Sequence, residues 1–463
     1  MISFYRGRCF PFICVLLILG PLTAFSQRYS GLQKLVEASK ENLPILKQKQ
    51  SLINAARANV TDVKHSFLPQ VKFSEQLNIS SDNSLAGSFF TLGITPSTSA
   101  GVRPTANMQA ATGNMAVLYS EYELVNFGLN QSKLANAQAY VDLQKSDLQK
   151  EEYLTSLQVA RLYFNSMKSK FRLEADKQNV NRYDSIFRVI TALTASGLKP
   201  GSDSSLAKAE LSKARITYYQ TLGYLNQLKE QLAYFTGIPV ANINIDSSSQ
   251  SFLVHTPIPI NLLPDSSGNP LIEYYNKRKN VYIANENLIK KSYLPKVLLA
   301  GSMWARGSSI QYNDAYKSLE TGLGYQRYNY AIGVAFTYNL FNGLYRKDRL
   351  AINRFDMEAS DFELKQQVAA VNSASLQADN ALLTTSTNLN ELPVQLNSAK
   401  ETYQQKLAQY RAGIISLIDL TNASFVLYRS QTDYIETMSD WYLAQLDKSV
   451  ATGKLYQFIQ TIK

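Results

Sequence analysis

The chain has 463 residues, of which 45% are hydrophobic and 18% charged, and its formal net charge is +11 at pH 7. Its basic residues, such as Lys277, Arg278 and Lys279, are interspersed with acidic and polar ones, whereas nucleic-acid binding needs one dominant basic face. Both cysteines, Cys9 and Cys14, lie near the N-terminus, so the rest of the chain cannot form disulfides or thiolate metal sites.

Residues 1–26 are predicted to be a secretory signal peptide. Arg6 and Arg8 precede an apolar run over 10–20, and the small residues of Ala24–Ser26 form a cleavage site. The apolar run is short for a membrane helix, and the rest of the sequence contains no apolar run long enough for one. Any membrane contact must therefore be made by strands. Cleavage would leave a net charge of about +9, because the segment carries two arginines and no acid. A lipid anchor is not expected.

The second half of the sequence repeats the first. FLPQV at Phe67–Val71 matches YLPKV at Tyr293–Val297, an offset of 226 (293 − 67), and Gly197 matches Gly413, an offset of 216 (413 − 197). One insertion of ten residues in the first copy explains both offsets, so the similarity indicates an internal duplication. We therefore expect a first repeat over 27–239, a second repeat over 270–455 and a C-terminal tail over 456–463. Between the repeats we expect a linker over 240–269 that includes a small packed subdomain, an equatorial one midway along the helices.

Each repeat is predicted to begin with a helix and two strands. In the first copy a helix over about 45–66 ends before Pro69, since proline disfavours a helix at the preceding residue. A strand over 70–80 and a second strand over 115–126 follow, separated by a polar loop over about 81–113 that belongs at an exposed rim.

A very long helix comes next. Leu129–Ser196 has neither glycine nor proline and is rich in helix-forming residues, so it predicts a helix of about 100 Å. A helix of this length needs packing partners along it, as in a coiled coil. It ends at Gly197, which suits a tight reversal, and a second helix over about 203–236 returns beside it.

The second repeat has the same predicted order. Its turn between long helices is at Gly413, and Pro393 should kink the first of those helices. The predicted elements are a helix over 271–292, strands over 296–305 and 330–340 around a polar loop over 306–327, and helices over 344–412 and 416–452.

The stretch Tyr330–Leu340 alternates between apolar residues and small or polar ones, which is typical of a strand with one apolar face. Small residues such as Ala331 and Gly333 fit the wet side of an open pore. Four such strands cannot close a barrel, and a sheet in lipid cannot keep open edges, so several chains must share one barrel. The predicted lipid-facing residues are Tyr330, Ile332, Val334, Phe336, Tyr338 and Leu340.

Three sets of residues resemble a known family. They are the Leu-Pro pairs before the first strand of each repeat, LVNFG and LFNG before the long helices, and YRAGIISLIDLTNA at Tyr410–Ala423. In this duplicated order the sequence resembles the TolC-like outer membrane efflux proteins over nearly the whole chain. The resemblance implies a mainly α fold with a small β part, a duplicated helical-hairpin channel-tunnel. Three chains would form a twelve-stranded transmembrane β-barrel on a long α-helical barrel.

The resemblance also implies a place and a function. The chain would be a homotrimer in the cell outer membrane, in contact with outer-membrane lipid and with a long periplasmic extension. It would be the exit duct of a tripartite efflux system, energised by an inner-membrane pump through a periplasmic adaptor protein. Small molecules such as drugs or metals would pass through it passively. Type I protein secretion uses the same kind of outer component and remains the alternative.

The family's functional residues map onto the turns of the two helical hairpins. Asp419 matches an acidic residue that narrows the tunnel, and Asn422 stands where many relatives have a second acid, so the expected ring carries half the usual charge. Asp419 has a simpler alternative as a helix-terminal acid, favoured by the helix dipole. The residues implied in adaptor docking are Tyr410, Arg411, Ala412, Gly413, Ile414, Ile415, Gly197, Leu198 and Lys199.

Other classes of protein fit the sequence less well. A periplasmic adaptor would have one hairpin between β-barrel and lipoyl-like domains rather than a tandem duplication, and a structural coiled-coil protein would not need the alternation at Tyr330–Leu340. An enzyme is not expected, because His65 and His255 are far apart and no GxSxG, GxxxxGK[ST] or HExxH motif occurs. We therefore expect no cofactor, no metal site and no nucleic-acid partner.

Overall fold

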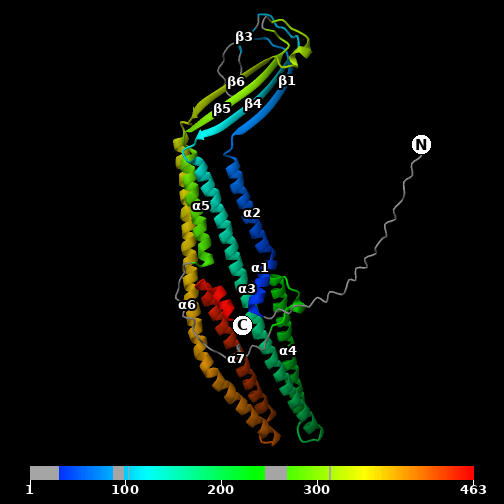
Figure 1. Cartoon of the computed structure of the whole chain (residues 1–463). Helices are drawn as coiled ribbons and strands as arrows, with labels where there is room; N and C mark the ends of the chain where they lie inside the picture. Colours follow the sequence, from blue (N-terminus) through cyan, green and yellow to red (C-terminus); the bar gives the residue numbers. More distant parts are fainter. Residues whose placement is uncertain (1–30, 87–98, 103, 246–267, 312–313, 463) are drawn as a thin grey trace, which may run out of the picture.

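A curved sheet lies at one end of the molecule, and long helices run from it to two turns at the other end (Figure 1). The predicted signal peptide and most of the predicted linker lie outside the described residues. Within the described part of the chain, no helix combines the length and the apolar character needed to cross a bilayer. This computed structural model describes residues 31–86, 99–102, 104–245, 268–311 and 314–462.

The first half of the chain contributes α1 (Leu32–Asn42), α2 (Pro44–His65), α3 (Leu129–Ala195) and α4 (Gly201–Thr236). The sequence predicted all but α1, which is separate from α2 because the residue before Pro44 has an extended backbone. α3 has 67 residues and is therefore about 100 Å long. α4 packs back along it to form the first helical hairpin.

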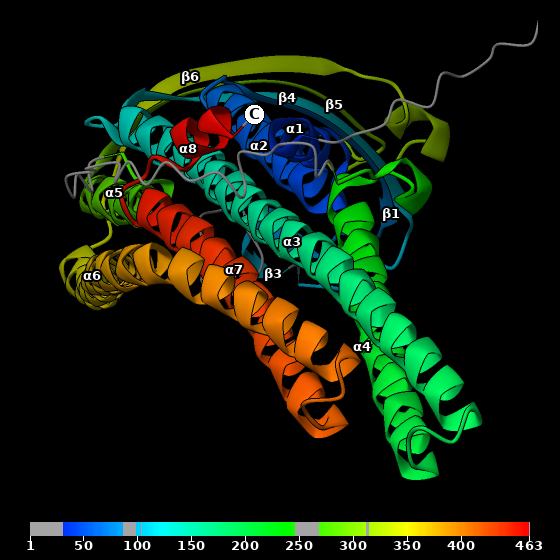
Figure 2. The ribbon, with the colours of Figure 1, turned by 90° about the horizontal axis from the view of Figure 1, so that it is seen from below.

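The second half contributes α5 (Pro270–Ser292), α6 (Asn342–Arg411), α7 (Leu417–Ala451) and α8 (Leu455–Thr461). α6 continues through Pro393 as one helix of 70 residues and curves gradually in its lower part, where the sequence predicted a kink (Figure 1). α6 and α7 form the second helical hairpin, beside the first (Figure 2). α8 begins at Leu455, the last residue of the expected second repeat, and continues into the range expected to be a tail.

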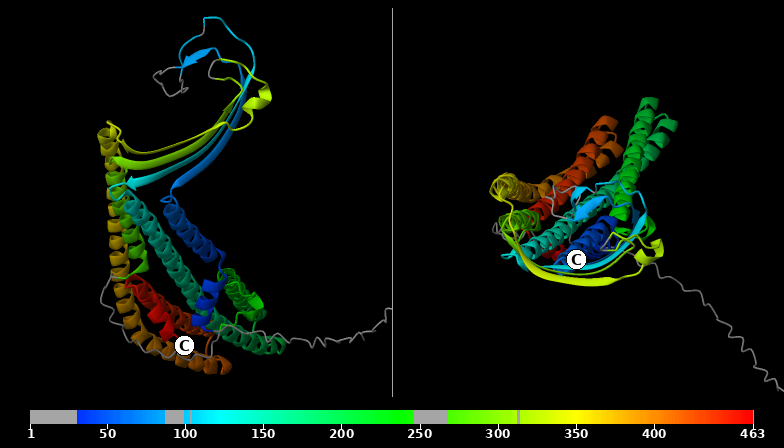
Figure 3. Two further views of the ribbon diagram at one scale, coloured as in Figure 1. Left: turned by 45° about the horizontal axis from the view of Figure 1, so that its top comes forward. Right: turned by 90° about the horizontal axis from the view of Figure 1, so that it is seen from above.

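Four antiparallel strands form the curved sheet in the order β1-β4-β5-β6 (Figure 3). A strand pair from each repeat contributes to it, and the two pairs meet where β4 lies beside β5. β1 and β6 are its edges, each with one neighbouring strand in the part of the chain that is described. β2 (Ser84–Ala86) pairs with β3 (Ser99–Val102) separately. The bounds of the four strands are Gln70–Ser80, Ala111–Val125, Lys296–Ser308 and Arg327–Thr337.

β6 begins and ends earlier than the predicted strand Tyr330–Leu340. Tyr338 and Leu340 follow it, in a turn where the Asn339 side-chain oxygen accepts a hydrogen bond from the Phe341 amide at 2.9 Å. The turn leads into α6, so the apolar alternation outlasts the strand. The predicted lipid-facing residues that do lie within β6 are Tyr330, Ile332, Val334 and Phe336.

The largest buried core lies midway along the helices, where α1, α3, α4, α7 and α8 meet. Phe164 of α3 stacks on Tyr442 of α7 with ring centroids 5.4 Å apart, and Phe458 of α8 lies 6.1 Å from Phe164. Leu35 of α1 is fully buried there. The two helices that the sequence did not predict, α1 and α8, therefore complete this core.

Asn269 joins α5 to α7 and gives a measurable test of how these two helices pack. Its side-chain oxygen caps α5 by accepting from the Leu271 amide at 3.0 Å, and its amide donates to the Val450 and Ala451 carbonyls of α7 at 3.1 and 3.2 Å. Asn269→Ala removes the cap and both hydrogen bonds to α7, and of the two acceptors only the Val450 carbonyl keeps other donors in the described part of the chain, the Tyr153 hydroxyl and the Gly453 amide. We therefore expect a loss of about 2 kcal/mol in the free energy of unfolding. Asn269→Ser keeps a cap acceptor and should lose less in thermal unfolding of the detergent-purified protein. Equal losses would contradict the capping role.

Candidate functional site

Both helical hairpins end in the same kind of turn, at the end of the molecule away from the sheet (Figures 1 and 2). Gly197 and Gly413 each have φ +75°, a left-handed conformation that favours glycine. The amides of Leu198 and Ile414 donate back to carbonyls in the last helical turn, both at 2.9 Å, which is the Schellman geometry. The two turns therefore repeat each other in structure as well as in sequence.

Apolar side chains are exposed at these turns. Leu198 is 70% exposed, Ile414 73% and Ile418 60%. A Cβ on either turn glycine would meet no atom within 4 Å, so another protein can approach this backbone closely. Arg411 is also exposed beside them. Apolar residues set among polar ones in this way are typical of a docking surface.

Tyr410 is the most deeply buried of the predicted docking residues and packs inside the tip, where the half-buried Ile415 joins the same cluster. Tyr410 is 2% exposed, in a cluster with Ile190 and Leu420, and the Lys199 ammonium lies 5.4 Å from its ring centroid. Burial raises the pKa of Tyr410, and the negative charge of Asp203 in the first turn of α4 raises it further. Tyr410 therefore ties the second hairpin to the first.

Asp419 forms a reciprocal cap at the start of α7. Its Oδ2 accepts hydrogen bonds from the Ser416 hydroxyl at 2.6 Å and amide at 3.1 Å, and its own amide donates to the Ser416 hydroxyl at 3.2 Å. These bonds lower the pKa of Asp419. Asp419 and Asn422 are both exposed, one helical turn apart. The cap is the role visible within one chain, and it leaves the carboxylate accessible.

The Asp419 cap predicts a pH-dependent start of α7. A carboxyl with a lowered folded-state pKa stabilises the fold at neutral pH, and this contribution is lost as pH falls through that pKa. We therefore expect Asp419→Asn to speed amide hydrogen exchange in the first turn of α7 at pH 7, with the difference from wild type shrinking in acid. Asn422→Ala, which touches no cap, is the control. An unchanged exchange rate in Asp419→Asn would refute the capping role.

Three polar contacts that the sequence did not indicate join α3 to α7. Their partners lie at least 252 residues apart in the chain, so no local pattern could reveal them. Together they hold the two hairpins side by side above the tips. The pairs are Tyr428–Asp176 at 2.6 Å, Arg172–Glu436 at 2.7 Å and Arg161–Asp447 at 2.6 Å.

The sheet has two faces of different character. The register aligns one apolar row across all four strands, namely Phe73, Leu118, Met303 and Tyr330. The row beside it points to the opposite face and holds Lys72, Tyr119, Ser302 and Ala331. On β6, Tyr330 is 82% and Ile332 77% exposed. An exposed apolar surface of this extent is typical of contact with lipid or another protein.

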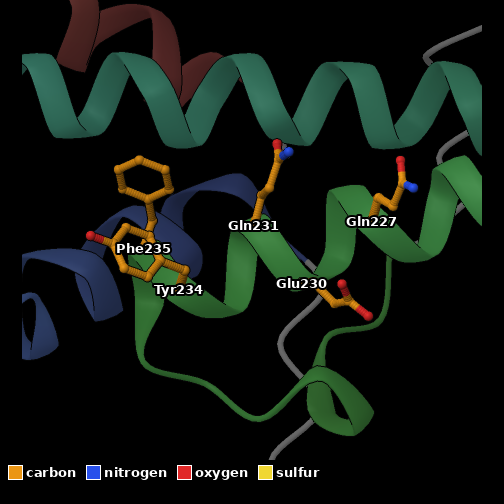
Figure 4. A pocket seen from close by; sticks show the side chains of 5 residues that line it. All are labelled: Gln227, Glu230, Gln231, Tyr234 and Phe235. Carbon is orange, nitrogen blue, oxygen red and sulfur yellow. The ribbon is translucent and has the colours of Figure 1, made fainter.

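Enzyme sites are usually enclosed pockets into which a few polar groups converge. One depression of this molecule is instead open to solvent and lined by α4 alone (Figure 4). Gln231 points toward α3, whereas Glu230 points away from it. In the described ranges, no group of three or more His, Cys, Asp or Glu side chains is placed to hold a metal ion. The residues that line the depression are Gln227, Glu230, Gln231, Tyr234 and Phe235.

Comparison with known proteins identifies the family to which this chain belongs. The family model described as outer membrane efflux protein matches residues 35–237 and 274–453. The chain belongs to the outer membrane efflux protein family. A search of curated proteins gave no match. The two matched segments fall one in each half of the chain.

Solved structures of two outer membrane channels and of another outer membrane protein share the fold. The outer-membrane channel OprN matches with a TM-score of 0.71 at 18% identity, covering 92% of this chain and 90% of its own. VceC from Vibrio cholerae matches with a TM-score of 0.72 at 14% identity (91% and 96%). The CmeC outer membrane channel of Campylobacter jejuni matches with a TM-score of 0.72 at 15% identity (93% and 90%). At these identities the likeness establishes the fold.

Membership of the outer membrane efflux protein family confirms the predicted family and fold class. The fold is mainly α with a small β part, and it is built as a duplicated pair of helical hairpins joined to a four-stranded sheet. The family consists of outer membrane channels and is not an enzyme family. The alternatives of a periplasmic adaptor and of a purely structural coiled-coil protein are thereby set aside.

Proposed function

We propose that three copies of this chain assemble into an outer-membrane channel-tunnel. The observation that carries the proposal is the four-stranded sheet, whose edge strands β1 and β6 each have one neighbour in the described part of the chain. Strands in lipid must have all their backbone groups paired, so β6 of one chain should pair with β1 of the next. Three sheets joined in this way would close a barrel of twelve strands.

The helices support the same assembly. α6 packs against α5 and α7 of its own chain, yet it leaves a row of apolar side chains exposed. α4 likewise exposes Ile216, Tyr219 and Tyr224. In a closed ring of helices, α6 of one copy would cover α4 of the next. The exposed apolar residues of α6 include Ile352, Phe355, Phe362, Leu376, Leu383 and Val394.

The hairpin turns would form the periplasmic mouth. Three copies of Asp419 around one axis would attract cations and repel one another, and Asn422 would add no charge. The exposed apolar residues at the turns would receive a periplasmic adaptor, through which an inner-membrane pump drives export. The residues proposed for docking are Gly197, Leu198, Arg411, Gly413 and Ile414, with Tyr410 supporting them from inside the tip.

The proposed activity is passive export of small molecules, such as drugs or metals, through a water-filled duct. The polar face of the sheet, with Lys72 and Ser302, would line the upper part of this duct. Such a duct selects by size and charge, so the molecule needs no enclosed binding pocket. The second candidate is the outer component of type I protein secretion, which would use the same duct.

The assembly is tested by native mass spectrometry and unboiled gels of protein extracted from the outer membrane fraction. A trimer in that fraction is expected. A monomer recovered from the periplasm would overturn the proposal. A deletion strain challenged with drugs and metals, and assayed for exported proteins, separates the two candidate functions. Sensitivity to drugs or metals is expected, whereas loss of a secreted protein alone would favour the second candidate.

A further inference from the structure

The loop between β5 and β6 folds back onto the sheet as a defined strap. This rim strap, residues 315–326, contains a short 3-10 helix at Leu319–Gly322 and lies near the upper end of the strands (Figure 1). The Thr112 hydroxyl donates to the Leu319 carbonyl, and the Asn114 amide donates to the Leu323 carbonyl at 2.7 Å. Gln326 donates to the Ser308 carbonyl at 3.0 Å. The strap is therefore fastened to β4 and β5.

Glycines allow the strap to touch the strands backbone to backbone. A Cβ at Gly322 would lie 2.2 Å from the Thr112 Oγ1, and a Cβ at Gly307 would lie 2.0 Å from the Gly324 carbonyl oxygen. No side chain fits at either position without moving the strap. A Cβ at Gly324, in contrast, would meet no atom within 4 Å. The close contact is thus built into particular positions of the sequence.

The strap lies on the apolar face of the sheet. Thr112 and Asn114, which hold it, point to the same side of β4 as Leu118, because side chains two residues apart share a face. Leu118 belongs to the apolar row with Met303 and Tyr330. The strap therefore covers the upper end of the face that carries the exposed apolar residues of β6.

The strap also reaches the far edge of the sheet. The Tyr325 hydroxyl donates to Glu75 Oε1 of β1 at 2.8 Å, and the Tyr325 ring lies 6.5 Å from that of Tyr328 at the start of β6. The register places Ala116 and Ala305 between Glu75 and Tyr328, and these short side chains leave room for the ring. Tyr325 thus satisfies an acid on the apolar face and lies beside the aromatic end of β6.

We propose that the rim strap is a lipid-contacting surface at the boundary of the membrane. This inference rests on the proposed barrel, in which the apolar face of the sheet points outward. The strap then forms the outermost layer of the wall over the ends of β4 and β5. Its Leu319 is 43% exposed, Leu323 52% and Tyr325 39%, continuous with Tyr328. Lys317 and Glu320 are exposed among them, a mixture suited to the headgroup region.

The strap supplies an aromatic side chain at a height where the strands beneath it have none. Membrane barrels carry aromatic girdles at their two interfaces. At this height the outward positions of β4 and β5 are Thr112, Asn114, Ala305 and Gly307, none of them aromatic. Tyr325, laid over these positions beside Tyr328, takes the place of the girdle in this sector of the wall.

The test uses nitroxide labels on the mature chain, which is free of native cysteines if cleaved as predicted. Single variants Leu323→Cys, Ile332→Cys and Ser302→Cys are labelled and reconstituted in phosphatidylcholine vesicles. Collision rates with oxygen, which concentrates in lipid, are compared with those of a water-soluble nickel chelate. We expect the Leu323 label to favour oxygen, at a shallower depth than the Ile332 label, and the Ser302 label to favour the chelate.

The outcomes distinguish a failure of the proposed lipid contact of the strap from a failure of the proposed barrel. A Leu323 label that favours the chelate, while Ile332 favours oxygen, overturns the lipid contact and leaves the barrel standing. A Leu323 label hidden from both probes means that a neighbouring chain covers the strap, and this also overturns the proposal. An Ile332 label that favours the chelate overturns the barrel itself.

A second pair of variants tests the strap directly. Gly322→Ala in the Leu323→Cys background should lift the strap and shift the label toward the chelate, because its Cβ would collide with Thr112. Gly324→Ala, whose Cβ meets nothing, is the matched control and should leave the label in lipid. Equal behaviour of the two variants would contradict the fastening of the strap.

Discussion

Ile332→Arg is expected to abolish assembly in the outer membrane, whereas Ala331→Arg, one residue away, should assemble. Ile332 lies near the middle of β6 on the apolar face and is 77% exposed in the single chain. An arginine on the lipid side of a barrel costs about 2–4 kcal/mol near the bilayer midplane, and a trimer carries the change in every copy. The measurement is the amount of trimer on unboiled gels of outer membrane fractions.

The control works because neighbouring residues of a strand point to opposite faces. Ala331 shares its row with Lys72, Tyr119 and Ser302, on the polar face. An arginine there would enter the water-filled duct, so the trimer should form and its single-channel conductance should change. If the two variants assembled equally well, the outward placement of the apolar face would be wrong.

Gly413→Trp is expected to stop export while leaving the trimer intact. A side chain at Gly413 would project into open space, so the chain itself can accommodate a large ring, but an approaching adaptor cannot. Because φ is +75°, the substitution also strains the turn, by about 1–3 kcal/mol for a residue held in the left-handed region. The measurement is whole-cell export by a deletion strain carrying the variant, beside trimer yield.

Gly413→Asn separates obstruction from strain. Asparagine tolerates left-handed backbone better than other residues, and its side chain is small. This variant should retain export close to wild type. Loss of export in both variants with normal trimer would mean that the conformation of the turn, rather than access to it, governs export. Normal export by Gly413→Trp would show that no partner closes on this turn.

Much of the architecture could be predicted because its signals are local or repeated. The absence of glycine and proline between Leu129 and Ser196 predicted α3 to within a residue, and the Leu-Pro pairs placed the starts of β1 and β5. The duplication, read from offsets such as that between Gly197 and Gly413, predicted that the two hairpin turns would be alike. Both turns indeed have the same backbone geometry.

The remainder depends on contacts between distant residues. α1 and α8 are short segments whose burial comes from the core around Phe164 and Tyr442, which no nearby pattern describes. The polar loop over 306–327 gave no sign that Gly322 and Tyr325 would fasten it to the sheet. The gate and docking roles proposed for the tips stay predictions, because they need copies and partners beyond one chain.

The order of the sheet has a consequence for how such a ring is put together. The joint between β4 and β5, inside one chain, links a first-repeat strand pair to a second-repeat pair, as the proposed joint between β6 and the next chain's β1 would. A ring of three chains then consists of six similar strand pairs and has nearly sixfold symmetry. Three of the six contacts between neighbouring pairs lie within a chain, because the duplication joins two pairs covalently. A chain of half the length would need five productive encounters to complete the same circle, and this one needs only two.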